Sequence, residues 1–466
     1  MNAIETSSND LQPAHRHESV LSEVLRIALP LVVSTGTFSI VLFMDRTMLL
    51  WHDGASMSAS MAGGNLFWVC LCLPMGIVSM TGAIISQYVG AGQEQKVGRF
   101  LWQAVWLSLI VTPFYLILGS FAEPLFSLSG QASELIPLQS SYFRILMLGS
   151  TGMLIESALS GFFSGTERTR VIMWVSLFSG LVNLILDSAL IFGVGPLPSF
   201  GIQGAAVASV LSLWFKAICY IALLTRKSTS ERYHILSGCI FDRRLIRRLL
   251  YFGFPAGLMH LVESGGFTAM MLRIGTFGDI PLRSTTMAIN FNMVAFIPLV
   301  GISIAASVLV GRHLIASGAA AATQRVMVAI AIGVTYSLLW IIAYLVFPDT
   351  LLNFYQLKSP DAGSIEASII ARTLLQFVSL YILFDAIQLI LAGALRGAGD
   401  TWFVLLAGLI TSGTAITIGF IFEPATNPLY WWWNVLSGWI ITLAVVMTLR
   451  FLQGRWKSMK MIDTAN

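Results

Sequence analysis

Charged residues are scarce in this chain of 466 residues. Asp, Glu, Lys and Arg together make up only 11% of it, against about 25% in soluble globular domains. That shortage, with 56% hydrophobic residues and a mean hydropathy of +0.79, excludes an ordinary soluble protein and predicts an integral membrane protein. The net charge is only +4 and no patch of basic and aromatic residues lies outside the loops, so we expect no nucleic-acid partner.

Motifs for catalysis and for metal binding are missing too. The chain has four cysteines, and no Cys or His cluster has the spacing of a zinc site. HExxH, GxSxG and Walker A motifs are absent, as are the paired aspartates of membrane enzymes that act on polyprenyl diphosphates. We therefore expect no enzyme and no cofactor. The first twenty residues contain no hydrophobic signal-peptide core, so no cleavable signal is expected.

Twelve hydrophobic runs are long enough to cross a bilayer as helices. They fall near residues 24–50, 61–89, 98–122, 136–163, 170–193, 202–225, 250–275, 285–311, 324–347, 369–395, 401–422 and 430–452. The sequence thus predicts an all-α integral membrane protein with twelve transmembrane helices in two six-helix lobes. The predicted segments are a polar tail (1–23), a first lobe (24–225), a basic linker (226–249), a second lobe (250–452) and a second tail (453–466).

The basic residues predict the orientation of these helices. All but seven of the 27 Lys and Arg residues lie in the two tails, in the even-numbered loops or at the adjoining helix ends. The exceptions are Arg46, Arg144, Lys216, Arg273, Arg283, Lys358 and Arg372. Because cytoplasmic loops carry an excess of Lys and Arg, we expect both termini in the cytoplasm of a protein that crosses the inner (plasma) membrane many times.

An internal repeat supports the division into two lobes. Pro30 in the first helix matches Pro255 in the seventh. SGFFSGTERT (160–169) at the end of the fourth helix matches AGALRGAGDT (392–401) at the end of the tenth. Since each half has an even number of spans, the repeats are expected to be parallel, related by an axis along the membrane normal.

Five acids lie inside predicted spans, where each costs about 2.5–3.5 kcal/mol to insert when charged and exposed to lipid. They are Asp45, Glu156, Asp187, Glu263 and Asp385. We therefore expect each to face a cavity, a partner or an ion.

Two of these acids are expected to meet in the first lobe. Asn183 and Asp187 lie four residues apart, hence on one helix face, and Asp45 lies at a similar depth. An amide beside a carboxylate suits a small cation, a shared proton or an interhelical hydrogen bond. Arg46 either pairs with Asp45 or extends toward the interface; the second is favoured.

In the second lobe, Tyr381 lies one helical turn before Asp385, and His260 lies one turn before Glu263. His260 is either a proton relay or an ordinary hydrogen-bonding residue. Glu156 has no such neighbour, and its partner is either Arg144, in the same predicted span, or Lys216, on another helix. These alternatives stay open from the sequence alone.

Several of these segments resemble the multidrug and toxic compound extrusion (MATE) family, over roughly residues 22–455. The similar segments include Pro30 with Asp45, SGTERTR (164–170), NLILDSALIFG (183–193), GIQGAAVAS (201–209), GFPAGLMHLVE (253–263) and YILFDAIQLILAGALRGAGDT (381–401). The last two are similar to the sodium-coupled, NorM-like bacterial branch. Ser209 stands where the family usually has threonine, and Arg46 stands where many members have a small or hydroxyl residue.

The resemblance implies two bundles around a central cleft that opens alternately to each side. It implies a cation site in the second lobe at Glu263, Tyr381 and Asp385, and another for a proton or Na+ in the first lobe at Asp45, Asn183, Asp187 and Ser209. Pro30 is implied as a point of helix bending. The expected activity is export of amphipathic, mostly cationic drugs in antiport with Na+ or H+, by a monomer in the lipid bilayer.

Two other kinds of membrane protein remain alternatives. A flippase for lipid-linked sugars, from the same broad superfamily, would need several Arg or Lys to meet a diphosphate, and few lie inside the predicted spans. A channel would need a continuous polar path with repeated pore-lining rings, whereas the acids here lie at a few mid-helix points.

Overall fold

The computed structural model describes residues 19–128, 134–193, 198–356 and 362–463. Most of the predicted first tail, residues 1–18, and the end of the second tail, 464–466, therefore lie outside the described residues. Across the described ranges the chain is helical and contains no strand, which confirms the predicted fold class.

Within the described ranges, twelve helices have at least 21 residues each. In chain order they are α1 (Val20–His52), α2 (Gly54–Gly90), α3 (Val97–Ser120), α5 (Ile136–Gly165), α6 (Thr169–Phe192), α7 (Gly201–Leu224), α9 (Arg243–Gly275), α10 (Asp279–Ala316), α11 (Ala319–Val346), α13 (Ala362–Ala398), α14 (Thr401–Ile421) and α15 (Pro428–Gln453). Eleven are long and apolar enough to cross a membrane. The exception is α9, whose middle carries His260 and Glu263. The chain is a multi-pass membrane protein.

Some helices extend well beyond their hydrophobic runs because a side chain caps their first turn. The Asp53 carboxylate accepts hydrogen bonds from the backbone nitrogens of Ala55 and Ser56, at 2.7 and 3.0 Å, so α2 begins at Gly54. Asp242 does the same for α9, which therefore begins at Arg243, inside the stretch predicted as the linker.

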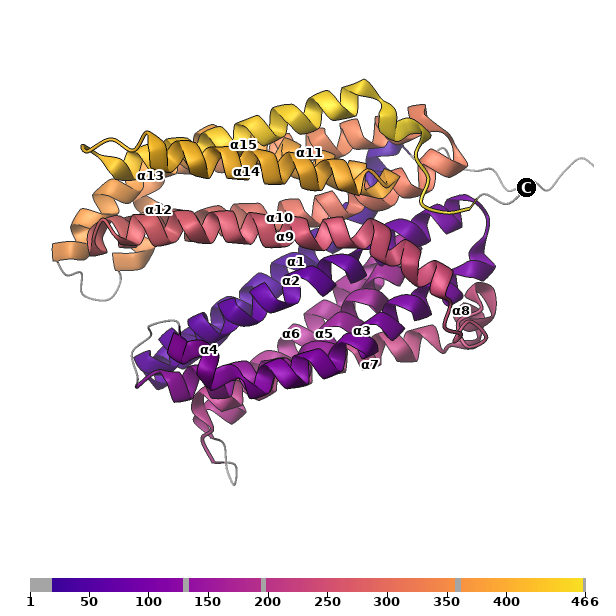
Figure 1. Cartoon of the computed structure of the whole chain (residues 1–466), viewed down its shortest axis with the longest axis horizontal. Coiled ribbons are helices and arrows are strands. Elements are labelled where there is room, and N and C mark those ends of the chain that lie inside the picture. Colours follow the sequence, from indigo (N-terminus) through magenta and orange to yellow (C-terminus); the bar gives the residue numbers. More distant parts are fainter. Residues whose placement is uncertain (1–18, 129–133, 194–197, 357–361, 464–466) are drawn as a thin grey trace, which may run out of the picture.

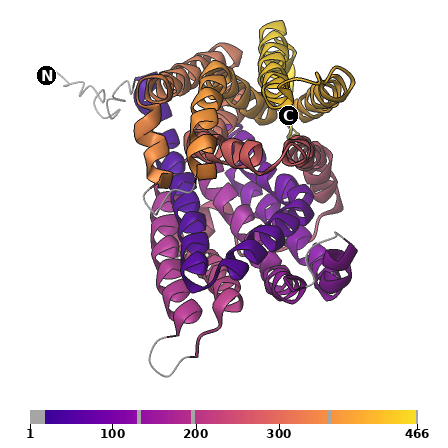
Figure 2. The same ribbon diagram turned by 90° about the vertical axis from the view of Figure 1, so that its left-hand side faces the viewer.

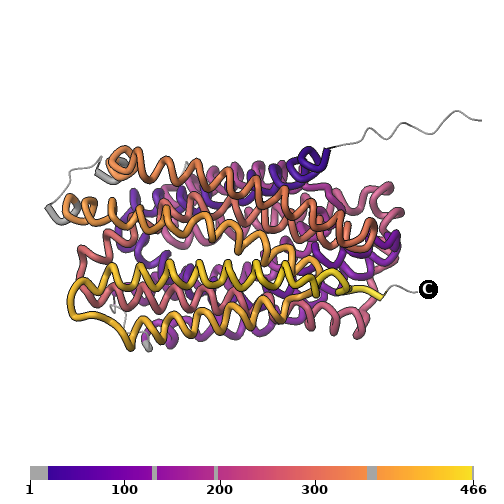
Figure 3. The backbone as a smooth tube through the Cα atoms, turned by 90° about the horizontal axis from the view of Figure 1, so that it is seen from above, coloured from indigo at the N-terminus to yellow at the C-terminus, as the bar shows by residue number. Residues whose placement is uncertain are grey.

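The long helices form two groups that follow the order of the chain (Figure 1). Helices α1–α7 make up the first group and α9–α15 the second, and all run along one long axis (Figure 3). The short helix α8 (Lys227–Tyr233) and the last described residues lie at one end, called the linker end; α4 (Ala122–Leu128) and α12 (Pro348–Gln356) lie at the other, called the loop end. Figure 3 shows α1 starting at the linker end as well.

Glycines predicted as repeat partners make equivalent contacts in the two groups. A β-carbon on Gly165 would collide with Gly82 and Ile85 of α2, and one on Gly397 would collide with the backbone of Ser307 on α10. In both groups the fourth predicted span thus packs closely against the second, because a glycine lets the two backbones approach. The repeat read from the sequence is therefore also a repeat of helix packing.

The two groups contact each other over the linker half of the molecule. Gly257 on α9 lies directly against the backbone of Leu73 on α2, and Gly301 on α10 lies against Val32 on α1. Toward the loop end the ribbons of the two groups diverge (Figures 1 and 2), and large side chains there are exposed, such as Phe43 of α1 at 57%. We refer to the contact between α1–α2 and α9–α10 as the seam.

At the loop end an ion pair fastens α9 to the turn between α14 and α15. The Glu423 carboxylate accepts two hydrogen bonds from the Arg273 guanidinium, at 2.5 and 2.9 Å, and one from the Trp432 indole nitrogen at 2.9 Å. The hydrogen bonds from Arg273 hold the pKa of Glu423 below its usual value. A carboxylate with a lowered pKa stabilises the folded state above its unfolded pKa, and this stabilisation is lost as pH falls through the folded pKa.

We expect Glu423→Gln to lower the unfolding temperature in detergent at neutral pH, because the charged hydrogen bonds are lost. In strongly acidic buffer the difference should disappear, since Glu423 is then protonated in the wild type as well. Glu123→Gln, at an exposed acid of α4, is the matched control. Equal stability of wild type and Glu423→Gln at neutral pH would contradict this role.

Candidate cation-binding sites

The first group gathers the predicted acids of α1 and α6 around one amide. With its nitrogen facing the acids, the Asn183 amide donates to Asp45 Oδ1 at 3.2 Å and to Asp187 Oδ2 at 3.0 Å. Ser209 Oγ on α7 donates to Asp45 Oδ2 at 3.3 Å. Asp45, Asn183 and Asp187 are only 6%, 1% and 0% exposed. The structure thus brings together all four residues of the expected first-lobe site.

Two carboxyl groups so close to each other in a buried place cannot both stay ionised without a compensating positive charge. Among the described residues, Asp187 Oδ1 has no hydrogen-bond partner, and neither acid takes part in an ion pair. A proton shared by the acids, or a small cation held by their hard oxygen atoms, would supply that charge. The geometry therefore suits reversible binding of a proton or of Na+.

The positive charge of Arg46 acts on Asp45 without a close ion-pair contact. This side chain follows Asp45 on α1 and is half-buried, but within the described chain it forms no ion pair with Asp45. The sequence-based preference against that pair agrees with this arrangement.

In the second group, α13 places Tyr381 and Asp385 one turn apart and buries both, at 1% and 6% exposure. Among the described residues, the Asp385 carboxyl group has no hydrogen-bond partner. The charge of Glu263 on α9 acts on Asp385. The Glu263 side chain is nevertheless 39% exposed, and its carboxylate pairs with His260 Nδ1 at 3.8 Å. The structure thus joins the three predicted residues only in part, and it brings His260 to Glu263.

The structure identifies the partner of the fifth acid, Glu156, which the sequence left open between Arg144 and Lys216. Lys216 Nζ on α7 lies 2.8 Å from Glu156 Oε1 on α5, with the side chains 19% and 10% exposed. Arg144 instead lines a hollow of about 330 Å³ at the loop end, between α3 and α5. An ion pair between two helices of the same group gives Glu156 and Lys216 a structural role.

Lys216→Met is expected to destabilise the protein by about 3–5 kcal/mol, because it leaves the Glu156 charge buried and unpaired. The double change Glu156→Gln/Lys216→Met removes both charges and should recover most of that loss. Thermal unfolding in detergent measures both effects. A single variant as stable as the wild type would exclude this pairing in solution.

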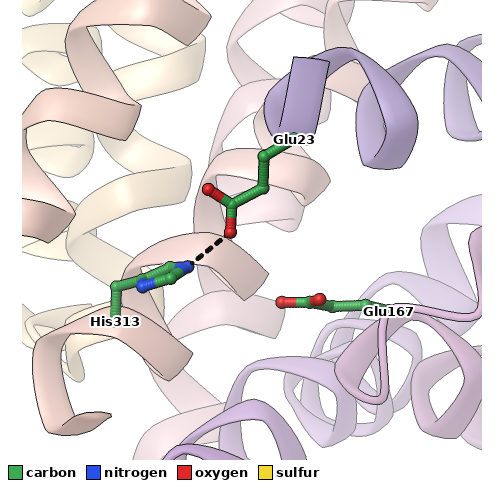
Figure 4. Close-up of side chains that lie close together, drawn as sticks. All are labelled: Glu23, Glu167 and His313. Atoms are coloured by element: carbon green, nitrogen blue, oxygen red, sulfur yellow. Dashed lines mark hydrogen bonds and ion pairs between the residues drawn. The ribbon is translucent and has the colours of Figure 1, made fainter. Parts of the chain in front are cut away.

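Sequence reasoning missed a network of charged residues that crosses the seam at the linker end. Figure 4 shows Glu23 of α1, His313 of α10 and Glu167, from the turn between α5 and α6, close together, with the Glu23 carboxylate on the His313 ring. Glu23 contacts His313 Nε2 at 2.8 Å and Arg325 of α11 at 2.8 Å, and Glu167 pairs with Arg312. Because arginines already neutralise both acids, we interpret this group as a set of ion pairs between the two groups of helices.

A signal for this network was present in the sequence. In the sequence, Glu167 lies in the SGTERTR segment. In the structure its backbone has φ +59°, a left-handed conformation that costs energy for a residue other than glycine. Its side chain is nevertheless 7% exposed. An acid in a short turn on the basic side of a membrane protein is a candidate for pairing with the arginines there.

Two related groups of helices, each with a buried acid in the middle of its spans, define a multi-pass membrane protein built from a repeated six-helix unit. The model of the MatE family matches residues 30–188 and 255–421, more than half of the chain. The chain belongs to the MatE family, as its motifs predicted.

Curated relatives and solved structures match this chain over nearly its whole length. The chain is 29% identical to the probable multidrug resistance protein NorM of Burkholderia mallei, over 92% of each chain. It is 27% identical to the multidrug resistance protein PmpM of Pseudomonas aeruginosa, over 93% of this chain and 91% of the other. The fold is similar to that of the eukaryotic MATE transporter AtDTX14, with a TM-score of 0.83 at 18% identity, covering 94% of this chain and 96% of the other.

A second solved structure has the same fold. It is described as the outward-facing conformation of a multidrug resistance MATE family transporter, and it matches with a TM-score of 0.83 at 19% identity, covering 95% of this chain and 98% of the other.

Proposed function

We propose that the protein is a secondary active multidrug efflux transporter, which exports amphipathic, mostly cationic compounds in antiport with Na+ or H+. The observation that carries this proposal is the buried pair Asp45 and Asp187 around the Asn183 amide, which needs a proton or a cation for charge balance. The relatives that cover most of the chain are named multidrug resistance proteins. Export of small molecules by a transporter, rather than catalysis by an enzyme, fits both the buried pair of acids and the names of the relatives.

The proposed mechanism is alternating access between the two groups of helices. In the structure the seam is packed at the linker end, while the groups diverge toward the loop end. An ion that binds the carboxylates with different affinity in the two states shifts the balance between them, and only such a difference can do so. Pro30, inside α1, is the proposed point where that helix bends.

The coupling site is proposed to include both sets of acids. Asp45, Asn183, Asp187 and Ser209 form the candidate set in the first group, and Tyr381, Asp385 and Glu263 the candidate set in the second. His260 is a candidate relay for protons, because it contacts Glu263. The Tyr381, Asp385 and Glu263 set favours Na+ weakly over H+.

The orientation is part of the proposal. The linker end carries most of the basic residues, including the arginines of the network at the seam, and cytoplasmic faces are rich in Lys and Arg. We therefore place the linker end and both termini in the cytoplasm, and the protein as a monomer in the inner membrane.

A flippase for lipid-linked sugars remains the second candidate. It would need several free Arg or Lys between the two groups to bind a diphosphate. Of the two mid-span cations described above, Lys216 is already paired with Glu156, and Arg46 lies beside Asp45 in the first group. This arrangement favours export of cationic compounds.

Reconstitution in liposomes tests the proposal. Efflux of a cationic dye is measured with a sodium gradient and then with a pH gradient, each imposed alone. Saturable transport that follows one of the gradients is expected. No response to either gradient would exclude the antiport, and a flux that does not saturate would indicate a channel.

A further inference from the structure

The segment that follows α15 crosses from the second group of helices to the first. It turns at Gly454, whose φ of +76° is left-handed, and continues through the short helix η2 (Arg455–Ser458). Trp456 anchors it to α15: its ring stacks on Phe451 with centroids 4.9 Å apart, and its indole nitrogen donates to the Phe451 carbonyl oxygen at 2.9 Å. We call residues 455–463 the clasp.

The far end of the clasp is buried against α2. Met461 and Ile462 are only 1% and 5% exposed, and both pack in the hydrophobic cluster formed mainly by the first group. The backbone nitrogen of Met461 donates to Gln87 Oε1 of α2 at 2.7 Å. Gln87 itself is 0% exposed, so this hydrogen bond is shielded from water.

Gln87 also holds the second group. Its amide nitrogen donates to the carbonyl oxygen of Gly397, near the end of α13, at 3.0 Å. The next turn of the chain makes room for the clasp: a β-carbon on Gly399, where φ is +105°, would lie 2.8 Å from the Met461 side chain. One buried glutamine on α2 thus joins the clasp and the end of α13.

An ion pair completes the contact. Asp463 lies 2.5 Å from a guanidinium nitrogen of Arg248 on α9, and Arg248 also donates to the hydroxyl group of Tyr88 on α2 at 3.3 Å. Because Asp463 is 82% exposed, this pair contributes little by itself. The buried pair of side chains and the Gln87 hydrogen bonds provide most of the attachment.

We propose that the clasp holds the two groups of helices together at the linker end and so sets the balance between the two conformations of the transporter. Separation of α2 from α13 at this end breaks the hydrogen bond from Gln87 to Gly397 and pulls apart the two ends of the clasp, one held on α15 and the other on α2. The clasp therefore stabilises the state in which the seam is packed. This inference rests on the proposed alternating access, and a distance measurement can test it without any transport assay.

The experiment uses the full chain with its four cysteines replaced and spin labels at Gln95, in the first group, and Ala320, in the second. Both positions are exposed at the linker end. Pulsed electron resonance gives the distribution of distances between the labels. Ending the chain after Gly454 should raise the ratio of separated to packed molecules about tenfold, which corresponds to about 1.4 kcal/mol.

A second variant keeps the chain length. Met461→Ser/Ile462→Ser should shift the distances in the same direction, because it removes the buried apolar surface of the clasp. Lys460→Ala, at an exposed position of the same segment, should leave the distribution unchanged.

Two results would overturn the inference in distinguishable ways. If both clasp variants lower the unfolding temperature but keep the wild-type distances, while the wild type still changes its distances between sodium chloride and acidic buffer, the clasp is only structural and alternating access stands. If no variant and neither condition changes the distances, alternating access fails together with the clasp.

Discussion

Replacing Asp187 with asparagine is expected to abolish gradient-driven efflux while the protein still inserts and folds. Asparagine keeps the shape of the side chain but removes the negative charge that a proton or Na+ would balance. A coupling free energy of about 1–3 kcal/mol corresponds to an effect of about 5–150-fold. We expect a loss toward the upper end of that range, because Asp187 is fully buried and, among the described residues, its Oδ1 has no hydrogen-bond partner while its Oδ2 accepts from the Asn183 amide.

Asp385→Asn is expected to have the same effect through the second group, where the carboxyl group of Asp385 is buried beside Tyr381. The measurement is dye efflux from liposomes with equal amounts of reconstituted protein. Unfolding temperature in detergent separates a lost function from a lost fold. Glu123→Gln, at an exposed acid far from both sites, controls for the loss of a carboxylate as such.

Full efflux by both Asp187→Asn and Asp385→Asn would exclude the proposed mechanism. Loss in only one variant would assign coupling to one group of helices. Because the two sets lie in different groups, their effects on a dye gradient are separable by comparing the double variant with each single one.

The sequence predicted the helices and most of the first candidate site for clear physical reasons. Spanning length and hydropathy identify helices directly, since a backbone that crosses lipid must satisfy its own N–H and C=O groups by hydrogen bonds, as a helix does. Asn183 and Asp187 share a helix face at a spacing of four residues, and Asp45 lies at a similar depth in its own span. The family resemblance then joined Asp45 to them in one site. The structure brings these three residues into contact.

Other features depended on packing between helices, which spacing along one helix cannot predict. The choice of Lys216 over Arg144 as the partner of Glu156 follows from the rotation of α5 and α7. The contact of Glu263 with His260 follows from their spacing on α9, but whether Glu263 also reaches Asp385 depends on how α9 lies relative to α13. The clasp was predicted only as part of the second tail, since its four apolar residues show no helical pattern in so short a segment.

The glycines of the seam connect the fold with the proposed mechanism. A bundle that stayed in one arrangement could fill the seam with larger side chains, which would pack more apolar surface. Instead, Gly76 of α2 and Gly257 of α9 bring the two backbones into direct contact. At these two positions backbone lies against backbone, so a larger side chain would meet atoms that cannot move aside.

Gly257→Val is therefore expected to force the seam open at the linker end. The added side chain would meet the backbone of Leu73, which cannot rotate away as a flexible side chain would. Overpacking typically costs about 1–3 kcal/mol, and this cost applies only to the state with a packed seam. The ratio of separated to packed molecules should rise by about 5–150-fold.

Labelling of a cysteine at the seam measures this shift. Ser86 of α2 is 0% exposed beside Gly311 of α10, so Ser86→Cys in a cysteine-free chain should react slowly with a maleimide. Adding Gly257→Val should speed the reaction. The matched control is Gly265→Val on the same helix, where a β-carbon would have no neighbour within 4 Å. If both valine variants react at the rate of the parent chain, the seam is a fixed interface and the two groups of helices do not separate there.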